Sequence, residues 1–261
     1  MMISGLYTDR SLLWSLSMKD FQRRFAGSFF GRTWGIINPL FTLCIYCFAF
    51  TFGFRSGDVN GFPFVLWFIC GMIAWLFFSE ALNSASNSFL EYSYLVKKVV
   101  FNISILPMVK ILSSFFIHLF FIFLTIILCI VLGYYPTLYW LQLPYYLFCM
   151  IVLLFGMTLA LGSIMVFFRD LNQIIGMALL AGLWGTPIAW DISQFPVNIH
   201  YVFKINPLFY IIDGYRDSFL SRNWFWNKDA MSIGFWIVTF ILVFAGGIVF
   251  NKLKGSFADV L

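Results

Sequence analysis

The sequence predicts an all-α integral membrane protein with six transmembrane helices and both termini in the cytoplasm. Hydrophobic residues make up 62% of the 261 residues and charged residues only 10%, and the mean hydropathy is +0.91. A soluble globule of this length has too little interior to bury so much apolar surface, so lipid must surround much of the chain. Stretches without charged residues also leave room for six helices of the ~20 residues that cross a bilayer.

The first predicted element is a cytoplasmic amphipathic helix that ends in an elbow, over residues 1-32. Four large apolar side chains recur at helical spacing and would share one face: Trp14, Met18, Phe21 and Phe25. The helix is therefore expected to lie in the membrane interface with this face toward lipid and Arg23, Arg24 and Arg32 toward the headgroups. The glycines of AGSFFGRTWG would let the chain turn into the membrane. Simple anchoring of cations on the inner side also accounts for the arginines.

The transmembrane domain is predicted over residues 33-261. Its spans are expected at about 33-54, 62-87, 107-133, 143-168, 172-190 and 231-250. The third and fourth spans share one charge-free stretch of 58 residues, Ile111 to Phe168, in which GYYPTLYW marks the turn. Residues 191–229 are too apolar for a solvated loop and too interrupted for a span. Short re-entrant helices, with their backbone shielded by protein, are expected there.

The distribution of cations predicts the orientation. With both termini inside, 11 of the 16 Lys and Arg residues fall in the inner segments and five in the outer ones. The positive-inside rule therefore favours cytoplasmic termini. The net charge of +5 has the same explanation, and no RNA-type motif accompanies it, so we do not expect a nucleic-acid partner.

The inner half of the second span carries a polar stripe that is a candidate substrate path. Glu80, Asn83 and Asn87 lie there among other polar residues at helical spacing, and ionisable groups inside a membrane usually face protein or water. A hydrated channel wall and interhelical hydrogen bonding explain this stripe equally well. Aromatic residues form 22% of the chain, and sugar C–H faces pack on aromatic rings. The aromatic candidates for the path are Tyr46, Phe50, Trp75 and Phe78, although most rings are expected to face lipid.

Five segments together resemble the ABC-2-type polysaccharide export permeases, which export O-antigen, teichoic acid and capsule. They are RRFAGSFFGRTWGIINPLF, GMIAWLFFSEALNSASNSFLEYSYLVKKVVFNISILP, FFRDL, INPLFYIIDGYRDSFL and GSFADVL. The first is similar to the family pattern R-x-R-Y-x-x-S-x-L-G-x-x-W-x-x-x-x-P-L, and the second to its L-x-K-K-V-x-F-P loop. Asn102 departs from this pattern, because the family usually has proline there. The resemblance covers the chain in order, and the loop is most similar to the O-antigen and teichoic-acid branch.

The resemblance implies a permease subunit of the bacterial inner membrane. Two copies would form a channel for a lipid-linked polysaccharide, and each would sit on a separate ATP-binding subunit. The loop implied to couple to this ATPase contains Glu91, Tyr92, Tyr94, Leu95, Lys97 and Lys98. Arg169 and Asp170 would begin a gating helix, although they also suit a plain capping loop. Arg23 or Arg24 could contact the pyrophosphate of the substrate.

The chain has no recognisable catalytic or cofactor-binding motif. It lacks the Gly-x-x-x-x-Gly-Lys-Ser/Thr loop that cradles ATP phosphates, so ATP and magnesium are expected on the partner subunit. Cys44-x-x-Cys47 lies in an apolar run and is better explained as small apolar filling than as a metal or redox pair. The alternatives to the polysaccharide exporter are an ABC-2 exporter of small molecules and, less favoured, a membrane-embedded transferase acting on lipid-linked sugars.

Overall fold

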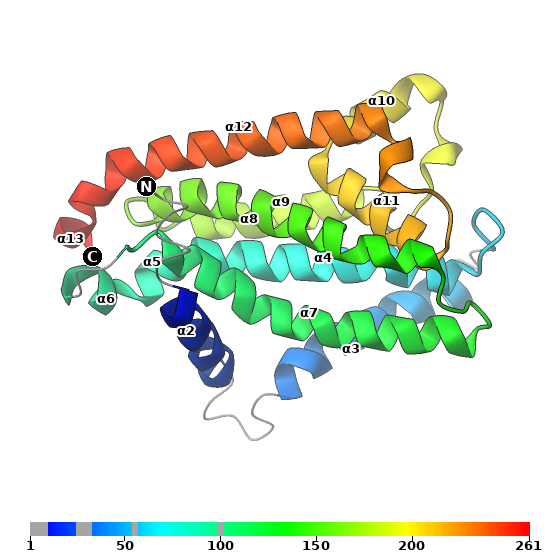
Figure 1. Ribbon diagram of the computed structural model, residues 1–261, viewed down its shortest axis with the longest axis horizontal. Helices are drawn as coiled ribbons and strands as arrows, with labels where there is room; N and C mark the ends of the chain where they lie inside the picture. The colour runs from blue at the N-terminus through cyan, green and yellow to red at the C-terminus, as the bar shows by residue number, and fades with distance from the viewer. Residues whose placement is uncertain (1–9, 25–32, 54–56, 99–101) are drawn as a thin grey trace.

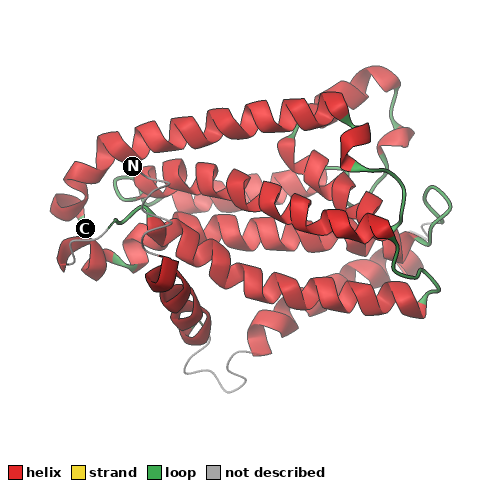
Figure 2. Ribbon diagram, in the orientation of Figure 1, coloured by secondary structure: helices red, strands yellow, loops and turns green. Residues whose placement is uncertain are grey.

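The computed structural model describes residues 10–24, 33–53, 57–98 and 102–261. Helices and connecting loops make up these residues, without a β-strand in the described part of the chain (Figure 2). Five helices are long and apolar enough to cross a membrane: α3 (Trp34–Phe48, extended by a π-helical turn to Gly53), α4 (Phe64–Ser86), α7 (Ile105–Val131), α8 (Leu143–Met165, after a 3-10 turn from Leu138) and α12 (Asp229–Leu253). The prediction of an all-helical membrane protein is confirmed.

Helix α9 (Leu171–Gly185) is shorter than the span predicted over 172-190. It covers 15 residues, which is about 22 Å of helix, whereas the hydrocarbon core of a bilayer is ~30 Å thick. Thr186, the residue after the helix, adopts extended dihedral angles of φ −103° and ψ 139°. Pro187 follows it, and a proline disfavours the helical conformation of the residue before it. The absence of charged residues over 172-190 does not indicate that the helix ends at Gly185.

The shorter helices gather at two opposite ends of the bundle (Figure 1). Near one end lie α2 (Arg10–Arg23), α5 (Ser88–Glu91), α6 (Ser93–Lys98) and α13 (Phe257–Val260). Near the other lie α10 (Val197–Ile205) and α11 (Pro207–Phe219). The segments that the sequence places inside and those that it places outside are therefore separated along the long axis of the molecule.

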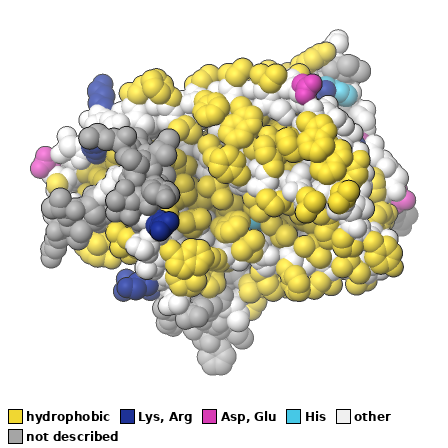
Figure 3. Space-filling view, in the orientation of Figure 1, with side chains coloured by type: hydrophobic (Ala, Val, Ile, Leu, Met, Phe, Trp, Pro, Cys, Tyr) yellow, Lys and Arg dark blue, Asp and Glu magenta, His cyan; other side chains and the backbone are white. Residues whose placement is uncertain are grey.

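Helix α4 forms the centre of the bundle. Most of its residues are buried, and it packs against α7, α8 and α11. By contrast, few residues of α3 and α12 are buried, and large side chains such as Phe41, Phe48 and Phe244 are exposed. Hydrophobic side chains cover the middle of the face seen in Figure 3, and charged side chains lie toward its ends. This arrangement is typical of a protein whose middle contacts lipid.

Two glycines allow α8 and α12 to pack closely. A Cβ atom on Gly246 would lie 2.3 Å from the carbonyl oxygen of Gly156, and a Cβ atom on Gly156 would lie 2.7 Å from the backbone nitrogen of Val243. The atoms in the way belong to backbone, so a larger side chain must push the helices apart. Small residues at such crossings let membrane helices approach closely.

Gly246→Ala is expected to lower the free energy of unfolding by about 1–3 kcal/mol through overpacking. Gly234→Ala is the matched control, because Gly234 lies in the same helix and an added Cβ atom would have nothing within 4 Å. Thermal unfolding of both variants in the same detergent would measure the difference. Equal midpoints would show that the two helices separate without cost.

Candidate functional site

Four side chains connect three helical elements at the end of the bundle where α2 and α5 lie. Lys110 of α7 places its Nζ atom 2.7 Å from Oδ1 of Asp20 on α2 and 2.5 Å from Oε2 of Glu91 on α5. The hydroxyl of Tyr92 donates a hydrogen bond of 2.7 Å to the same Oδ1 atom of Asp20. We call Asp20, Glu91, Tyr92 and Lys110 the inner ion cluster. One ammonium group thus contacts carboxylates from two elements that are far apart in the sequence.

Burial divides the inner ion cluster into a sheltered and an open half. The side chains of Lys110 and Asp20 are each 7% exposed, whereas that of Glu91 is 51% exposed. Burial raises the pKa of Asp20, but the hydrogen bond and charge of Lys110, assisted by Tyr92, outweigh it and leave the pKa below its ordinary value. Burial and the bond to Asp20 raise the pKa of Tyr92. Asp20 is therefore ionised near neutral pH, and Tyr92 keeps the proton that it donates.

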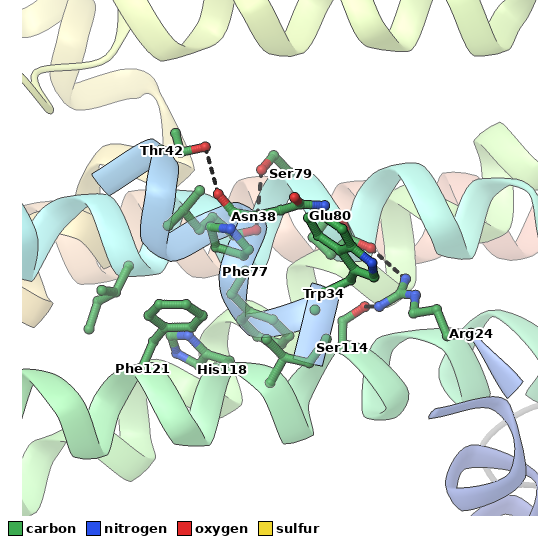
Figure 4. Close-up of a pocket in the computed structure, with 15 residues that line it drawn as sticks. Arg24, Trp34, Asn38, Thr42, Phe77, Ser79, Glu80, Ser114, His118 and Phe121 are labelled. Carbon is green, nitrogen blue, oxygen red and sulfur yellow. Dashed lines mark hydrogen bonds and ion pairs between the residues drawn. The ribbon is translucent and has the colours of Figure 1, made fainter. Parts of the chain in front are cut away.

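A second ion pair joins α2 to the centre of the bundle. Nη2 of Arg24 lies 2.5 Å from Oε1 of Glu80 on α4, and Nη1 of Arg24 donates to Oγ of Ser114 on α7 over 3.3 Å (Figure 4). Asp20 and Arg24 are four residues apart, so they share one side of the helical path of α2. Two ion pairs therefore attach α2 to the bundle. Asp20 contributes the carboxylate of the first pair, and Arg24 contributes the cation of the second.

The Arg24–Glu80 pair lies at the edge of a cavity of about 280 Å³ between α2, α3, α4 and α7. Polar side chains, among them Asn38 and Ser114, line it together with this pair, and aromatic and aliphatic side chains line the rest (Figure 4). At the aromatic part, His118 is buried, stacks on Phe77 with ring centroids 4.5 Å apart, and lies 2.8 Å from the hydroxyl of Tyr215. The cavity can accommodate a group that is polar at one end and apolar at the other.

The predicted polar stripe of the second span makes contacts between helices. Glu80 pairs with Arg24, and Asn83 is exposed. The side-chain nitrogen of Asn87 donates to the Asn83 carbonyl oxygen over 3.0 Å and to Oδ1 of Asn172, next to the start of α9, over 2.9 Å. Asn87 therefore joins the end of α4 to α9, which is a contact of the kind that the interhelical explanation of the stripe describes.

The predicted aromatic candidates fall into two separate places. Tyr46 and Phe50 pack on the ring of Phe68, with centroids 6.1 Å and 5.7 Å away. Trp75 and Phe78 are buried and instead line an apolar groove of about 480 Å³ between α4, α8, α9 and α12. The four rings do not line one continuous path within a single chain.

The predicted coupling loop forms α5 and α6 and presents two kinds of side chain. Tyr94 and Lys97 are exposed, Leu95 is half-buried, and Glu91 and Tyr92 belong to the inner ion cluster. The side chain of Lys98 is not among those described. The loop therefore offers an open surface on one side and an ionic connection to the bundle on the other.

The remaining predicted residues lie at the surface or outside the described residues. Arg23 is exposed at the end of α2, and Arg32 lies outside the described residues. Arg169 and Asp170 are exposed in the turn before α9. Asp170 is the N-cap residue of α9, and its side chain makes no capping hydrogen bond.

Sequence reasoning missed Asp20 and Lys110. Asp20 was expected on a polar side of the interface helix, yet it is 6% exposed, and Trp14 on the apolar side is 56% exposed. The polar edge of α2 thus packs on protein, while part of the apolar face stays open, as suits contact with lipid. The available signal was Lys110 itself, because a cation within an apolar helix usually has a specific partner.

Comparison with known proteins places these features in a family. Residues 11–220 match the ABC-2 type transporter family. An O-antigen export system permease protein RfbA from Klebsiella pneumoniae is 30% identical over 251 residues, which are 96% of this chain and 95% of that protein. A second from the same organism is 28% identical over the same shares, and one from Myxococcus xanthus is 24% identical over 99% of this chain and 98% of its own. This chain belongs to the ABC-2 type transporter family.

Proposed function

We propose that this chain is the transmembrane subunit of an ATP-driven exporter that moves a lipid-linked polysaccharide, most specifically O-antigen, across the bacterial inner membrane. The observation that carries the proposal is similarity to three O-antigen export permeases along 96% to 99% of the chain. The motifs that resemble polysaccharide export permeases run through the same length. A multi-pass helical bundle is the architecture that such a subunit needs.

The proposed topology has six crossings with both termini in the cytoplasm. Helix α9 would be the fifth crossing, completed by the residues that follow it, and α10 and α11 would enter the outer leaflet without crossing it. The separation of the short helices to two ends supports this topology (Figure 1). The four exposed large side chains of α9 recur at helical spacing and would face a second copy of the chain: Ile174, Met177, Leu180 and Trp184.

A separate ATPase is proposed to dock on α5 and α6. The exposed ring of Tyr94 and the half-buried Leu95 offer it an apolar contact, and the exposed Lys97 adds positive charge. The sequence places a second cation, Lys98, next to it. ATP and magnesium would bind to that subunit, since this sequence has no phosphate-binding loop. We therefore propose that this chain acts as the permease subunit and that its partner hydrolyses ATP.

The exposure of the remaining predicted residues supports the roles that we propose for them. Arg23 is open to lipid headgroups, whereas Arg24 is already paired with Glu80. Glu80, Asn83 and the groove that holds Trp75 and Phe78 are proposed to border the substrate path. Arg169 and Asp170, exposed before α9, are proposed to lie at its cytoplasmic gate.

Deleting the gene in its host is expected to trap lipid-linked polysaccharide on the cytoplasmic side of the inner membrane, because synthesis continues without export. The measurement is the amount of polymer on each side of that membrane, with the wild-type gene as the control for rescue and Glu80→Ala as a probe of the path. Normal surface polysaccharide after deletion would contradict the proposal and favour a small-molecule exporter. Loss of polymer from both sides would indicate a transferase.

A further inference from the structure

We propose that Lys110 is a positioning residue that couples the ATPase-docking segment to helix α2. It would do so by holding Glu91 of α5 and Asp20 of α2 with one ammonium group. The inference rests on the proposed function, because it assumes that an ATPase docks on α5 and α6. The docking segment would then be connected to the bundle in two ways: by the direct continuation of α4 into α5, and by the contacts of Lys110.

The first step is that α5 and α2 are attached to each other at two points. Lys110 bridges Glu91 and Asp20, and Tyr92, the residue after α5, donates directly to Asp20. A displacement of α5 therefore acts on α2 through side chains alone, across 71 positions of sequence between Asp20 and Glu91. Charge-assisted hydrogen bonds of this kind are shorter and stronger than those between neutral groups.

The second step is that the two ion pairs of Lys110 differ in how easily they break. The Asp20 side chain is 7% exposed, so separating it from Lys110 would leave a buried charge without its counter-ion. The Glu91 side chain is 51% exposed, and an ion pair with an exposed carboxylate contributes little. Docking of a partner on α5 would therefore change the Glu91 contact, while Asp20 and Lys110 stay together.

The third step connects α2 to the cavity. Asp20 and Arg24 are one helical turn apart, and Arg24 pairs with Glu80 at the cavity edge (Figure 4). Tilting α2 about the Asp20–Lys110 pair would move Arg24 relative to Glu80. The connection thus runs from Glu91 through Lys110, Asp20 and Arg24 to Glu80, and it includes α5, α7, α2 and α4.

The test uses the full chain with its cognate ATPase in membrane vesicles, and it measures polysaccharide export and ATP hydrolysis on the same preparation. Lys110→Met is expected to lower the export per ATP hydrolysed by about tenfold, within the usual range of coupling between sites. Asp20→Asn should give a similar loss and Glu91→Gln a smaller one. Lys19→Met is the matched control, because Lys19 is an exposed cation beside Asp20. The export per ATP hydrolysed by this variant should equal that of wild type.

Two further variants separate coupling from stability. Lys110→Met leaves Asp20 buried without a counter-ion, so it is expected to unfold more easily, whereas adding Asp20→Asn removes both charges and should restore folding. If Lys110 acts by coupling, this double variant remains folded but keeps the low ratio of export to hydrolysis. Exchanging all three charges, with Asp20→Lys, Glu91→Lys and Lys110→Asp together, keeps opposite charges in both contacts and should recover part of the ratio.

Four results would overturn the inference. A wild-type ratio in Lys110→Met, with export and hydrolysis each at the wild-type level, would show that the contact carries no signal. Recovery of the wild-type ratio in the double variant, or a parallel fall of export and hydrolysis with the amount of folded protein, would show that Lys110 only stabilises the bundle. Absence of ATP-dependent export by the wild-type complex would contradict the proposed function, and the inference with it.

Discussion

Arg216→Met is expected to lower the free energy of unfolding by about 3–5 kcal/mol, because buried acceptors left without donors cost about 1–3 kcal/mol each. Arg216 of α11 is 2% exposed. Its guanidinium donates to the carbonyl oxygens of Trp67, Pro187 and Ile188 over 3.3, 2.8 and 2.8 Å. It also lies over the Trp67 ring, 3.5 Å from the centroid. One side chain thus connects α11 to the start of α4 and to the turn after α9.

The space for this guanidinium is provided by Gly71 of α4. A Cβ atom there would lie 2.9 Å from Nη2 of Arg216. Arg216→Lys is expected to give an intermediate loss, because a single ammonium group cannot reach three carbonyl groups in a fixed fork or lie flat on a ring.

Thermal unfolding in detergent measures these losses, and Arg222→Met is the matched control. The Arg222 side chain is 29% exposed and lies 3.9 Å from Asp217, so its removal should cost less than about 1 kcal/mol. If Arg216→Met and Arg222→Met unfold at the same temperature, Arg216 does not hold these segments together.

The helical membrane character of the chain could be predicted because it depends on composition summed over long stretches. Helix α4 lies at Phe64–Ser86, where 62-87 was predicted, and α7 lies at Ile105–Val131, where 107-133 was predicted. Helix α9 ends at Gly185 because Pro187 limits the backbone before it. That local steric effect is not visible in a count of charges.

The ionic contacts could be predicted less well, because they join residues that are distant in the sequence. Helical periodicity identified a polar side of α2, but it could not show whether Asp20 faces water or Lys110 of α7. Likewise, the partners of the charges in IIDGYRDSFL cannot be deduced from their spacing along one helix. The structure instead directs Arg216 to backbone carbonyl groups of other segments and Asp213 to Lys228, before α12. Such pairings depend on how helices pack in three dimensions.

Lys228→Met is expected to destabilise the end of the bundle that holds α11 by about 3–5 kcal/mol, since removing one partner of a buried ion pair leaves an uncompensated charge. Nζ of Lys228 lies 2.5 Å from Oδ2 of Asp213 and is also paired with Asp217. The side chains of Lys228 and Asp217 are 11% and 1% exposed. Lys228 therefore joins α11 to the segment that begins α12, and without it two carboxylates would remain side by side.

The loss in Lys228→Met is expected to be greatest at alkaline pH and to shrink as the pH falls. Burial and the charge of Asp213 already raise the pKa of Asp217 to about 6, and removal of Lys228 raises it further. A carboxyl group whose pKa is higher in the folded state destabilises that state only when it is ionised, so the penalty is absent below its unfolded pKa and grows with pH. Unfolding midpoints measured between about pH 5 and pH 8 would follow this trend.

Asp217→Asn in the Lys228→Met background tests the cause. A neutral amide needs no counter-ion, so this second substitution should recover part of the lost stability and flatten the dependence on pH. In the wild-type chain, Asp217→Asn should change the free energy of unfolding by a smaller amount, because Lys228 still pairs with Asp213. A pH-independent loss in Lys228→Met, with no recovery in the double variant, would mean that the loss does not arise from ionised carboxylates left without the lysine.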